Sequence, residues 1–201
     1  MIHNKKLINL LAIGFSLGLS FTVLAQEVAV NEVRLSAQEQ TKLDAGKVVL
    51  KGKNGEYVGQ VLANGNLEKA WEVITDYNDF KNFLPNVIDS KVVNKEGNTT
   101  VFEQTSEVDL FLFKEQFTVR IAAVASQPQK VNFEIVEGDL KQLQGTWEVS
   151  VTDSQQILVT HTVAVEPASN TEKPFFYGIY ESSLEKTLNA IAQEITKRSK
   201  S

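Results

Sequence analysis

The sequence predicts an α+β protein in which a curved antiparallel sheet packs against one long C-terminal helix. Residues 87–166 alternate apolar and polar side chains in successive segments separated by turn residues, which is typical of hairpin-connected strands. Residues 174–198 instead repeat apolar side chains every three or four positions, which indicates a helix with one apolar face. Residues 67–85 show the same helical spacing, interrupted once, so two short helices are expected before the sheet continues.

The first 25 residues have the composition of a signal peptide. Lys5 and Lys6 precede a largely apolar stretch, residues 7–24, and the chain then offers a small-residue cleavage pattern ending at Ala25. The alternative is a retained membrane anchor, but the stretch is near the lower length limit for a span and contains several polar residues. We therefore expect residues 1–25 to be removed and the protein to be exported to the periplasm or another extracytoplasmic compartment.

Composition restricts the classes of function. Apolar residues make up 42% of the 201 residues, which is enough for a sizeable core. The net charge of -5 argues against nucleic acid as a partner, because phosphate binding needs a basic surface. The chain has no cysteine, which excludes disulfides and thiolate chemistry, and cleavage would leave a single histidine. One histidine and no cysteine argue against a transition-metal site. No glycine-rich phosphate loop is present either, so we expect neither a metal nor another cofactor.

The N-terminal elements are marked by their caps. Residues 26–46 are interpreted as a linker and a short helix, since Ser36 and Glu39 have the capping-box spacing and Gly46 can end the helix. The domain proper is expected at residues 47–199. It opens with a hairpin that turns at Asn54-Gly55, the strongest two-residue hairpin signal.

The helical pair in residues 67–85 follows this hairpin. Asn66 can cap the first helix, Asp76 interrupts the pair, and Pro85 stops the second helix. The aromatic side chains of the pair are spaced to face inward, which suggests a lid on the sheet. These aromatic residues and their neighbours are Trp71, Asp76-Tyr77, Phe80 and Phe83-Leu84-Pro85.

These residues resemble the first-helix signature of the START-like (SRPBCC) superfamily, in its polyketide cyclase/dehydrase branch, which includes coenzyme Q-binding proteins. The resemblance covers roughly residues 48–198. It implies the helix-grip fold, in which a curved antiparallel sheet wraps around a long C-terminal helix and leaves an apolar cavity between them. One fold hosts many functions, so the resemblance identifies a fold far better than a ligand or a reaction.

The cavity implied by the resemblance would be lined by inward-facing residues of the strands and of the last helix. For each residue taken singly, ordinary core packing is the alternative interpretation. Apart from Phe83 in the second short helix, the expected lining residues alternate on the apolar face of a strand or follow the helical stripe. The full set is Phe83, Phe117, Phe133, Trp147, His161, Phe176, Tyr180 and Leu184.

Three features of the sequence leave two interpretations open. His161 lies on the apolar register of its strand. It is either a polar group that contacts a ligand or acts as acid/base, or it is a neutral core histidine or one that a register slip exposes. The Tyr180 hydroxyl either enters the cavity or reaches solvent at the helix edge. The apolar run 110–113 is either an exposed tip that makes transient membrane or partner contact, or a strand covered on both faces.

The function expected from these observations is binding of a hydrophobic small molecule, such as a quinone, isoprenoid, carotenoid or lipid, without a catalytic residue. One alternative is a polyketide cyclase or dehydratase, which would need a proton shuttle inside the cavity, for which the sequence offers only His161, Tyr180 and Glu103. A further alternative is a protein-interaction module whose core is filled. An apolar cavity without paired polar groups favours the first function, and a filled core favours the last.

Overall fold

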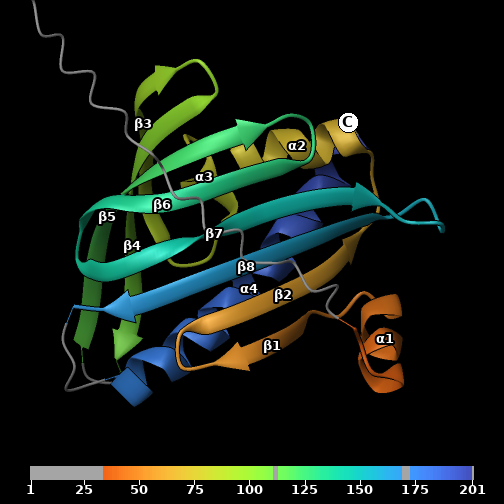
Figure 1. The fold of residues 1–201 in the computed structure, drawn as a ribbon, viewed down its shortest axis with the longest axis horizontal. Coiled ribbons are helices and arrows are strands. Elements are labelled where there is room, and N and C mark those ends of the chain that lie inside the picture. Colours follow the sequence, from red (N-terminus) through yellow and green to blue (C-terminus); the bar gives the residue numbers. More distant parts are fainter. Residues whose placement is uncertain (1–33, 111–112, 169–172, 201) are drawn as a thin grey trace, which may run out of the picture. The chain divides into compact units, whose positions relative to one another are not determined.

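The computed structural model describes residues 34–110, 113–168 and 173–200. The chain divides into residues 1–34 and residues 35–201, and the fold below is that of the second unit. The predictions of a signal peptide and of most of the linker lie outside the described residues. The elements are α1 (Ala37–Asp44), β1 (Val49–Lys53), β2 (Glu56–Ala63), α2 (Leu67–Thr75), α3 (Phe80–Phe83), β3 (Val87–Glu96), β4 (Thr99–Leu110), β5 (Phe113–Ser126), β6 (Lys130–Gly138), β7 (Leu140–Val151), β8 (Ile157–Pro167) and α4 (Lys173–Arg198) (Figure 1).

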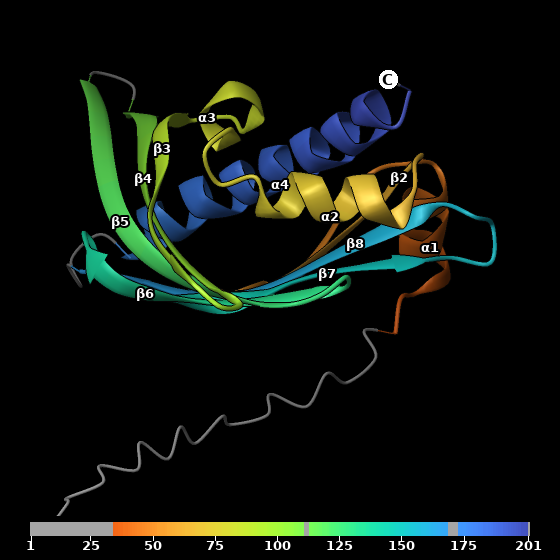
Figure 2. The same ribbon diagram turned by 90° about the horizontal axis from the view of Figure 1, so that it is seen from above.

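The described strands form one antiparallel sheet in the order β1-β2-β8-β7-β6-β5-β4-β3. The hairpin β1–β2 pairs with the last strand, β8, so segments about a hundred residues apart in sequence lie side by side. The sheet curls strongly: β4 and β5 rise beside the rest of the sheet, and α4 lies within the concave side with α2 and α3 next to it (Figure 2). This arrangement confirms the predicted helix-grip fold.

The ends of the short helices form where the sequence places caps. The Ser36 backbone NH donates to Glu39 Oε2 over 2.7 Å, and the Glu39 backbone NH donates back to Ser36 Oγ. Gly46 follows α1 with a φ of 70°, a left-handed conformation that glycine adopts without strain. Asn66 Oδ1 accepts from the Lys69 backbone NH over 2.9 Å and caps α2. The interruption predicted at Asp76 is the C-cap of α2.

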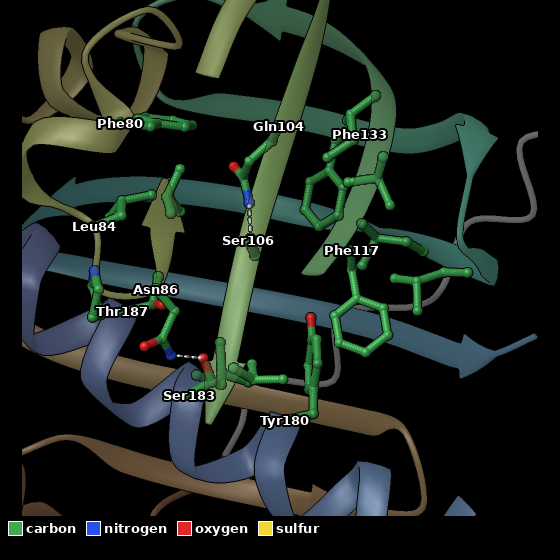
Figure 3. Close-up of a pocket in the computed structure, with 18 of the residues that line it drawn as sticks. Phe80, Leu84, Asn86, Gln104, Ser106, Phe117, Phe133, Tyr180, Ser183 and Thr187 are labelled. Atoms are coloured by element: carbon green, nitrogen blue, oxygen red, sulfur yellow. Dashed lines mark hydrogen bonds between the residues drawn. The ribbon is translucent and has the colours of Figure 1, made fainter. Parts of the chain in front are cut away.

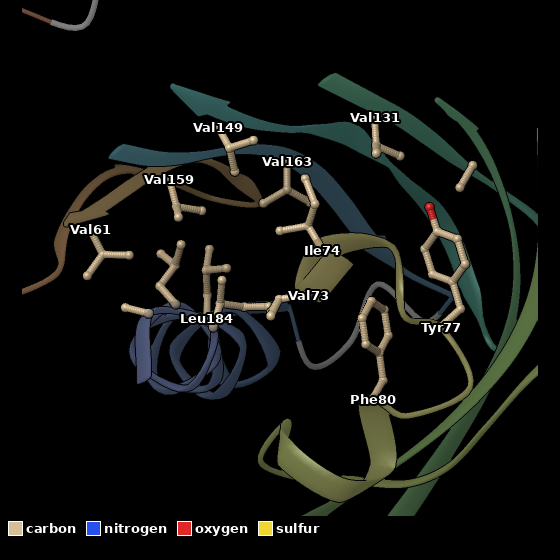
Figure 4. Packing of buried hydrophobic residues seen from close by; sticks show 14 of the residues in the cluster. Val61, Val73, Ile74, Tyr77, Phe80, Val131, Val149, Val159, Val163 and Leu184 are labelled. Atoms are coloured by element: carbon tan, nitrogen blue, oxygen red, sulfur yellow. The ribbon is translucent and has the colours of Figure 1, made fainter. Parts of the chain in front are cut away.

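The core lies between the centre of the sheet and the C-terminal half of α4. In β8 every second residue is buried, as the alternation predicts, and Val159 has no exposed surface. Leu188 and Ile195 of α4 are likewise fully buried against this face. Figure 4 shows strand valines and side chains of α2 and α4 meeting in this layer. Burial of these apolar groups is the main stabilising contribution to the fold.

Arg198 ties the joint between α2 and α3 to the end of α4. Its guanidinium donates to Asp76 over 2.8 Å, to Asp79 over 3.0 Å and to Glu194 over 2.9 Å. The same guanidinium lies 5.4 Å from the centre of the Phe83 ring. The position of the two short helices is therefore fixed by a charge network as well as by apolar contacts.

The apolar run at residues 110–113 spans the end of the β4–β5 hairpin, where Leu110 pairs with Phe113. Residues 111–112 and the side chains of residues 109–113 lie outside the described residues, so neither interpretation of this run is tested. No helix in the described part of the chain is long and apolar enough to cross a membrane.

Candidate functional site

A cavity of about 530 Å³ lies between the curled sheet and the N-terminal half of α4. Its walls come from α2 and α3, from the loop that follows α3, from the concave faces of β4 to β8, and from α4. Figure 3 shows side chains from these elements pointing into one space. The curled strands β4 and β5, which rise beside the rest of the sheet in Figure 2, contribute one wall of this cavity.

The cavity contains most of the residues that the sequence places there. The predicted residues that line it are Phe117, Phe133, Trp147, His161, Phe176, Tyr180 and Leu184. Phe83 is not a lining residue, which corrects the expectation for this position. It lies on the side of α3 that faces Arg198, with its ring 5.8 Å from Phe80, and Phe80 contributes to the cavity instead.

Three rings on neighbouring strands form a flat wall of the cavity. The His161 ring stacks on Trp147 with 3.7 Å between ring centroids, and on Phe133 with 5.5 Å. Trp147 and His161 are directly paired across β7 and β8, which brings their side chains together on one face. Phe133 lies over Gly145, where an added Cβ would be 2.9 Å from the phenyl ring. The glycine in β7 therefore makes room for the aromatic wall.

His161 is held as a neutral side chain. It is 4% exposed, and its Nδ1 lies 3.0 Å from the Thr146 carbonyl oxygen. Since a carbonyl only accepts, Nδ1 carries the proton and donates, and Nε2 is an acceptor. Burial lowers the pKa of His161 to about 3, which outweighs the opposing effect of the hydrogen bond to Thr146. Such a group is a poor proton donor near neutral pH.

Tyr180 lies at the opposite wall, in the second turn of α4. Its ring stacks on Phe176 at 5.9 Å and on Tyr57 at 6.0 Å. Burial raises the pKa of the Tyr180 hydroxyl, with a smaller contribution from Tyr57, so the group stays protonated. The hydroxyl points into the cavity (Figure 3), which favours the first of the two interpretations of this residue.

One side of the cavity is polar, and this side was not predicted from the sequence. Gln104 and Ser106 of β4 line it, and Gln104 Nε2 donates to Ser106 Oγ over 3.1 Å. Opposite them, Asn86 Nδ2 donates to Ser183 Oγ over 3.1 Å and joins the loop after α3 to α4. Gln104 shares the parity of the inward-facing Phe102, and this signal was available in the sequence.

Charged groups are few in the cavity. The described lining residues include Glu115 and Asp139, both exposed, and no lysine or arginine. Within the described residues no group of three or more histidine, aspartate or glutamate side chains is placed to hold a metal ion. Chemically, the cavity offers a large apolar volume, one buried acceptor nitrogen and several uncharged hydrogen-bonding groups.

Solved structures with the same architecture include two kinds of protein. The aromatase/cyclase Zhui from Streptomyces sp. R1128 superposes with a TM-score of 0.58 at 15% identity, covering 75% of this chain and 95% of that one. A STAR-related lipid transfer protein from Xanthomonas axonopodis gives a TM-score of 0.59 at 15% identity, with coverages of 74% and 92%. At such identities the likeness establishes the fold alone.

A START superfamily protein from Mycobacterium smegmatis is also similar, with a TM-score of 0.57, 12% identity and coverages of 77% and 98%. Among curated proteins, none matches the chain in sequence. The sequence model of the family described as polyketide cyclase/dehydrase and lipid transport matches residues 65–192, which is more than half of the chain. Together with its helix-grip architecture and its cavity, this match shows that the chain belongs to the polyketide cyclase/dehydrase and lipid transport family.

Proposed function

We propose that this protein binds a single hydrophobic small molecule, such as a quinone, isoprenoid, carotenoid or lipid, in the cavity between the sheet and α4. The observation that carries the proposal is an apolar cavity of about 530 Å³. Cavities of roughly 300–1,000 Å³ with mostly apolar walls are typical of small-molecule sites. The existence of this cavity also argues against an interaction module with a filled core.

Desolvation supplies the binding energy in this proposal. Apolar surface removed from water contributes roughly 25 cal/mol per Å², so a ligand that buries about 300 Å² gains roughly 7 kcal/mol before the entropic cost of association. The aromatic wall of Phe133, His161 and Trp147 adds specific ring contacts for a planar or unsaturated ligand. In this proposal the helical pair at residues 67–85 and the start of α4 form the gate, and the Asn86–Ser183 hydrogen bond joins the loop after α3 to α4.

A cyclase or dehydratase would require a residue that moves protons at the reacting carbon. The only histidine in the described part of the chain donates to a backbone carbonyl and has a strongly lowered pKa. The carboxylates that line the cavity, Glu115 and Asp139, are exposed, and Asp139 accepts from the Thr118 backbone NH over 2.7 Å. The absence of an acid/base pair among these groups favours binding over catalysis.

Native mass spectrometry tests the proposal directly. Residues 26–201 are purified from the native host, sprayed intact, and extracted with organic solvent. We expect a co-purifying quinone, isoprenoid or lipid at one molecule per chain. A protein that emerges empty, and that also fails to bind a panel of prenyl and acyl probes, contradicts the proposal.

A pair of neighbouring substitutions assigns the binding to this cavity. Ala123 of β5 lines the cavity, whereas Ala122 lies on the other face of the same strand. Ala123→Phe fills part of the cavity and is expected to lower the occupancy of the co-purifying ligand at least tenfold. Ala122→Phe adds the same ring outside and leaves occupancy unchanged. Equal occupancy in both folded variants would place the ligand elsewhere.

We also propose that the protein acts outside the cytoplasm. The support is the sequence of residues 1–25, with its two lysines, apolar stretch and small-residue cleavage pattern. A carrier in such a compartment would keep an insoluble ligand in solution between membranes or enzymes.

A further inference from the structure

We infer that Tyr180 and Gln104 bind an uncharged polar group of the ligand, a carbonyl or a hydroxyl, and that the cavity rejects amphiphiles with an anionic head. This inference deepens the proposed function and rests on it. It assigns a ligand class: a largely apolar body with one neutral oxygen group. It rests on the hydrogen-bonding groups left open in the cavity and on the distribution of charge around it.

Tyr180 supplies a hydrogen-bond donor on the α4 side of the cavity. Its hydroxyl points into the cavity, and the described residues give it no hydrogen-bond partner (Figure 3). By contrast, the neighbouring Tyr57 does not line the cavity, and its hydroxyl donates to the Tyr177 carbonyl. A ligand that displaces water from this hydroxyl has to offer an acceptor, because a polar group left unpaired in an apolar space is costly. A ligand carbonyl oxygen is the group that accepts this hydrogen bond.

Gln104 supplies the complementary acceptor from the sheet. Its Nε2 donates a hydrogen bond to Ser106 Oγ. This bond orients the side-chain amide and leaves Oε1 as an acceptor for a ligand. Within the described residues nothing donates to Gln104 Oε1, although the residue lines the cavity. A ligand hydroxyl can therefore donate to Gln104, whereas a ligand carbonyl or hydroxyl oxygen can accept from Tyr180. The two side chains come from β4 and α4, so they approach the cavity from different walls (Figure 3).

The charge distribution excludes a carboxylate or phosphate head. The two charged residues of the described lining, Glu115 and Asp139, are both acidic. An anion entering the cavity would lose its hydration without gaining a cationic partner, which is strongly unfavourable. The two exposed carboxylates of the lining would in addition repel it. A neutral oxygen group suffers neither penalty.

Ligands with one ten-carbon body and different heads test the inference. Decane, 2-decanone, 1-decanol, methyl decanoate and decanoate are each used at pH 8 to displace the neutral fluorescent probe N-phenyl-1-naphthylamine from residues 26–201. We expect 2-decanone and 1-decanol to displace the probe at lower concentration than decane. Decanoate should bind at least about tenfold more weakly than methyl decanoate, because only the acid is ionised.

Two variants on different elements assign the effect to the named side chains. Tyr180→Phe keeps the ring and removes the hydroxyl, and it should weaken 2-decanone about three- to tenfold while leaving decane unchanged. Gln104→Met keeps the side-chain length and should weaken 1-decanol by a similar factor. Tyr57→Phe, which removes a hydroxyl outside the cavity, is the matched control and should change neither affinity. Thermal unfolding verifies that each variant is folded.

The outcomes separate this inference from the proposed function. If the probe and decane bind but the head group makes no difference, or decanoate binds as tightly as its ester, only this inference is overturned. The same holds if Tyr180→Phe and Gln104→Met leave the affinities for ketone and alcohol as they are in the unmodified chain. If neither the probe nor any ligand binds, the proposed function falls and the inference with it.

Discussion

A histidine inside an apolar wall behaves as a neutral structural group rather than as an acid. The chain places His161 between Trp147 and Phe133 and satisfies its Nδ1 with the Thr146 carbonyl. Protonation would create a buried positive charge on the His161 ring, and no carboxylate of the described residues is paired with it. The folded protein therefore holds His161 neutral, and this makes the stability of the fold depend on pH.

The sign of that dependence follows from the lowered pKa. The unfolded chain takes up a proton near the ordinary pKa of 6.5, whereas the folded chain resists it down to about 3. The contribution of His161 to stability is complete above pH 6.5 and is lost as pH falls toward 3, by up to about 1.4 kcal/mol per pH unit. His161→Asn, whose neutral amide can still donate to Thr146, should remove this loss.

Urea unfolding at pH 7, 5.5 and 4.5 measures this effect. Other groups that titrate in this range are shared by both chains, so the difference between the unmodified protein and His161→Asn isolates the histidine. The destabilising effect of the substitution should be largest at pH 7 and shrink at lower pH. A difference that stays constant over this range would contradict a neutral, buried His161.

At Gly145 the neighbouring strand and the Phe133 ring occupy the space that a side chain would need. An added Cβ would lie 1.9 Å from the Thr162 carbonyl oxygen and 2.9 Å from the Phe133 ring. Gly145→Ala should therefore lower the free energy of unfolding by at least about 2 kcal/mol. Gly178 on α4 has no atom within 4 Å of its Cβ position, and Gly178→Ala should raise stability by about 0.5–1 kcal/mol.

Chemical denaturation of the two variants provides the measurement. Both variants introduce the same methyl group. Changes of opposite sign in the free energy of unfolding would therefore separate steric crowding at Gly145 from the conformational entropy of glycine at Gly178. If Gly145→Ala proved neutral, the close approach of β8 and Phe133 to this strand would be disproved.

At the scale of elements, α4 has two different halves. Its C-terminal half supplies core residues such as Leu188, Ile191 and Ile195, which are fully or nearly fully buried. Its N-terminal half carries Phe176 and Tyr180, which face the cavity. One regular helical stripe thus passes from a packed core into a ligand cavity, because the sheet bends away from it along its length.

The network at the end of α4 predicts how the two short helices are held. Arg198→Ala removes three charge-assisted hydrogen bonds and leaves Asp76, Asp79 and Glu194 close together without their shared cation. Because Glu194 is buried whereas Asp76 and Asp79 are half-buried, we expect a loss of about 1–3 kcal/mol in the free energy of unfolding, measured with urea. Arg198→Lys should recover only part of it, since an ammonium cannot make the same planar set of contacts.

Lys200→Ala is the matched control for this prediction. It removes one exposed positive charge two residues away, keeps the backbone hydrogen bond to the Lys197 carbonyl, and should change stability by less than about 0.5 kcal/mol. Equal effects of Arg198→Ala and Lys200→Ala would mean that the network contributes only through net charge.

At the scale of the whole molecule, the curvature of the sheet creates the cavity. A flat sheet of these strands would pack on α4 along its entire length and bury the aromatic residues as core. The curl instead makes β4 and β5 rise beside the rest of the sheet (Figure 2), and residues of both strands and of α4 line the cavity. Bulges in the β3–β4 and β5–β6 pairings lie in this curved half, where irregular pairing increases bending.

The export proposal gives a prediction for the complete protein. If residues 1–25 are removed, the intact mass of the protein isolated from its host corresponds to a chain that begins at Gln26. The protein should be recovered from the extracytoplasmic fraction without detergent. Recovery of the full-length chain in the membrane fraction would support the anchor alternative instead.

Local patterns in the sequence were sufficient for the elements and their order. The capping box at Ser36, the Asn54-Gly55 turn and the alternation of β8 each depend on neighbours within a few residues, so a single sequence shows them. The helix-grip arrangement came from the resemblance of residues 67–85, and the structure confirms it. Seven of the eight expected lining residues face the cavity because parity along a strand and spacing along a helix fix the direction of a side chain.

What only the tertiary structure decided depends on contacts between distant segments. Phe83 turns to Arg198, 115 residues away, and no local pattern signals that partner. The polar side of the cavity arises because Gln104, Ser106, Asn86 and Ser183 converge from β4, the loop after α3, and α4. The sequence by itself thus determined which face each residue takes, whereas the curvature of the sheet decided which faces enclose a cavity rather than a core.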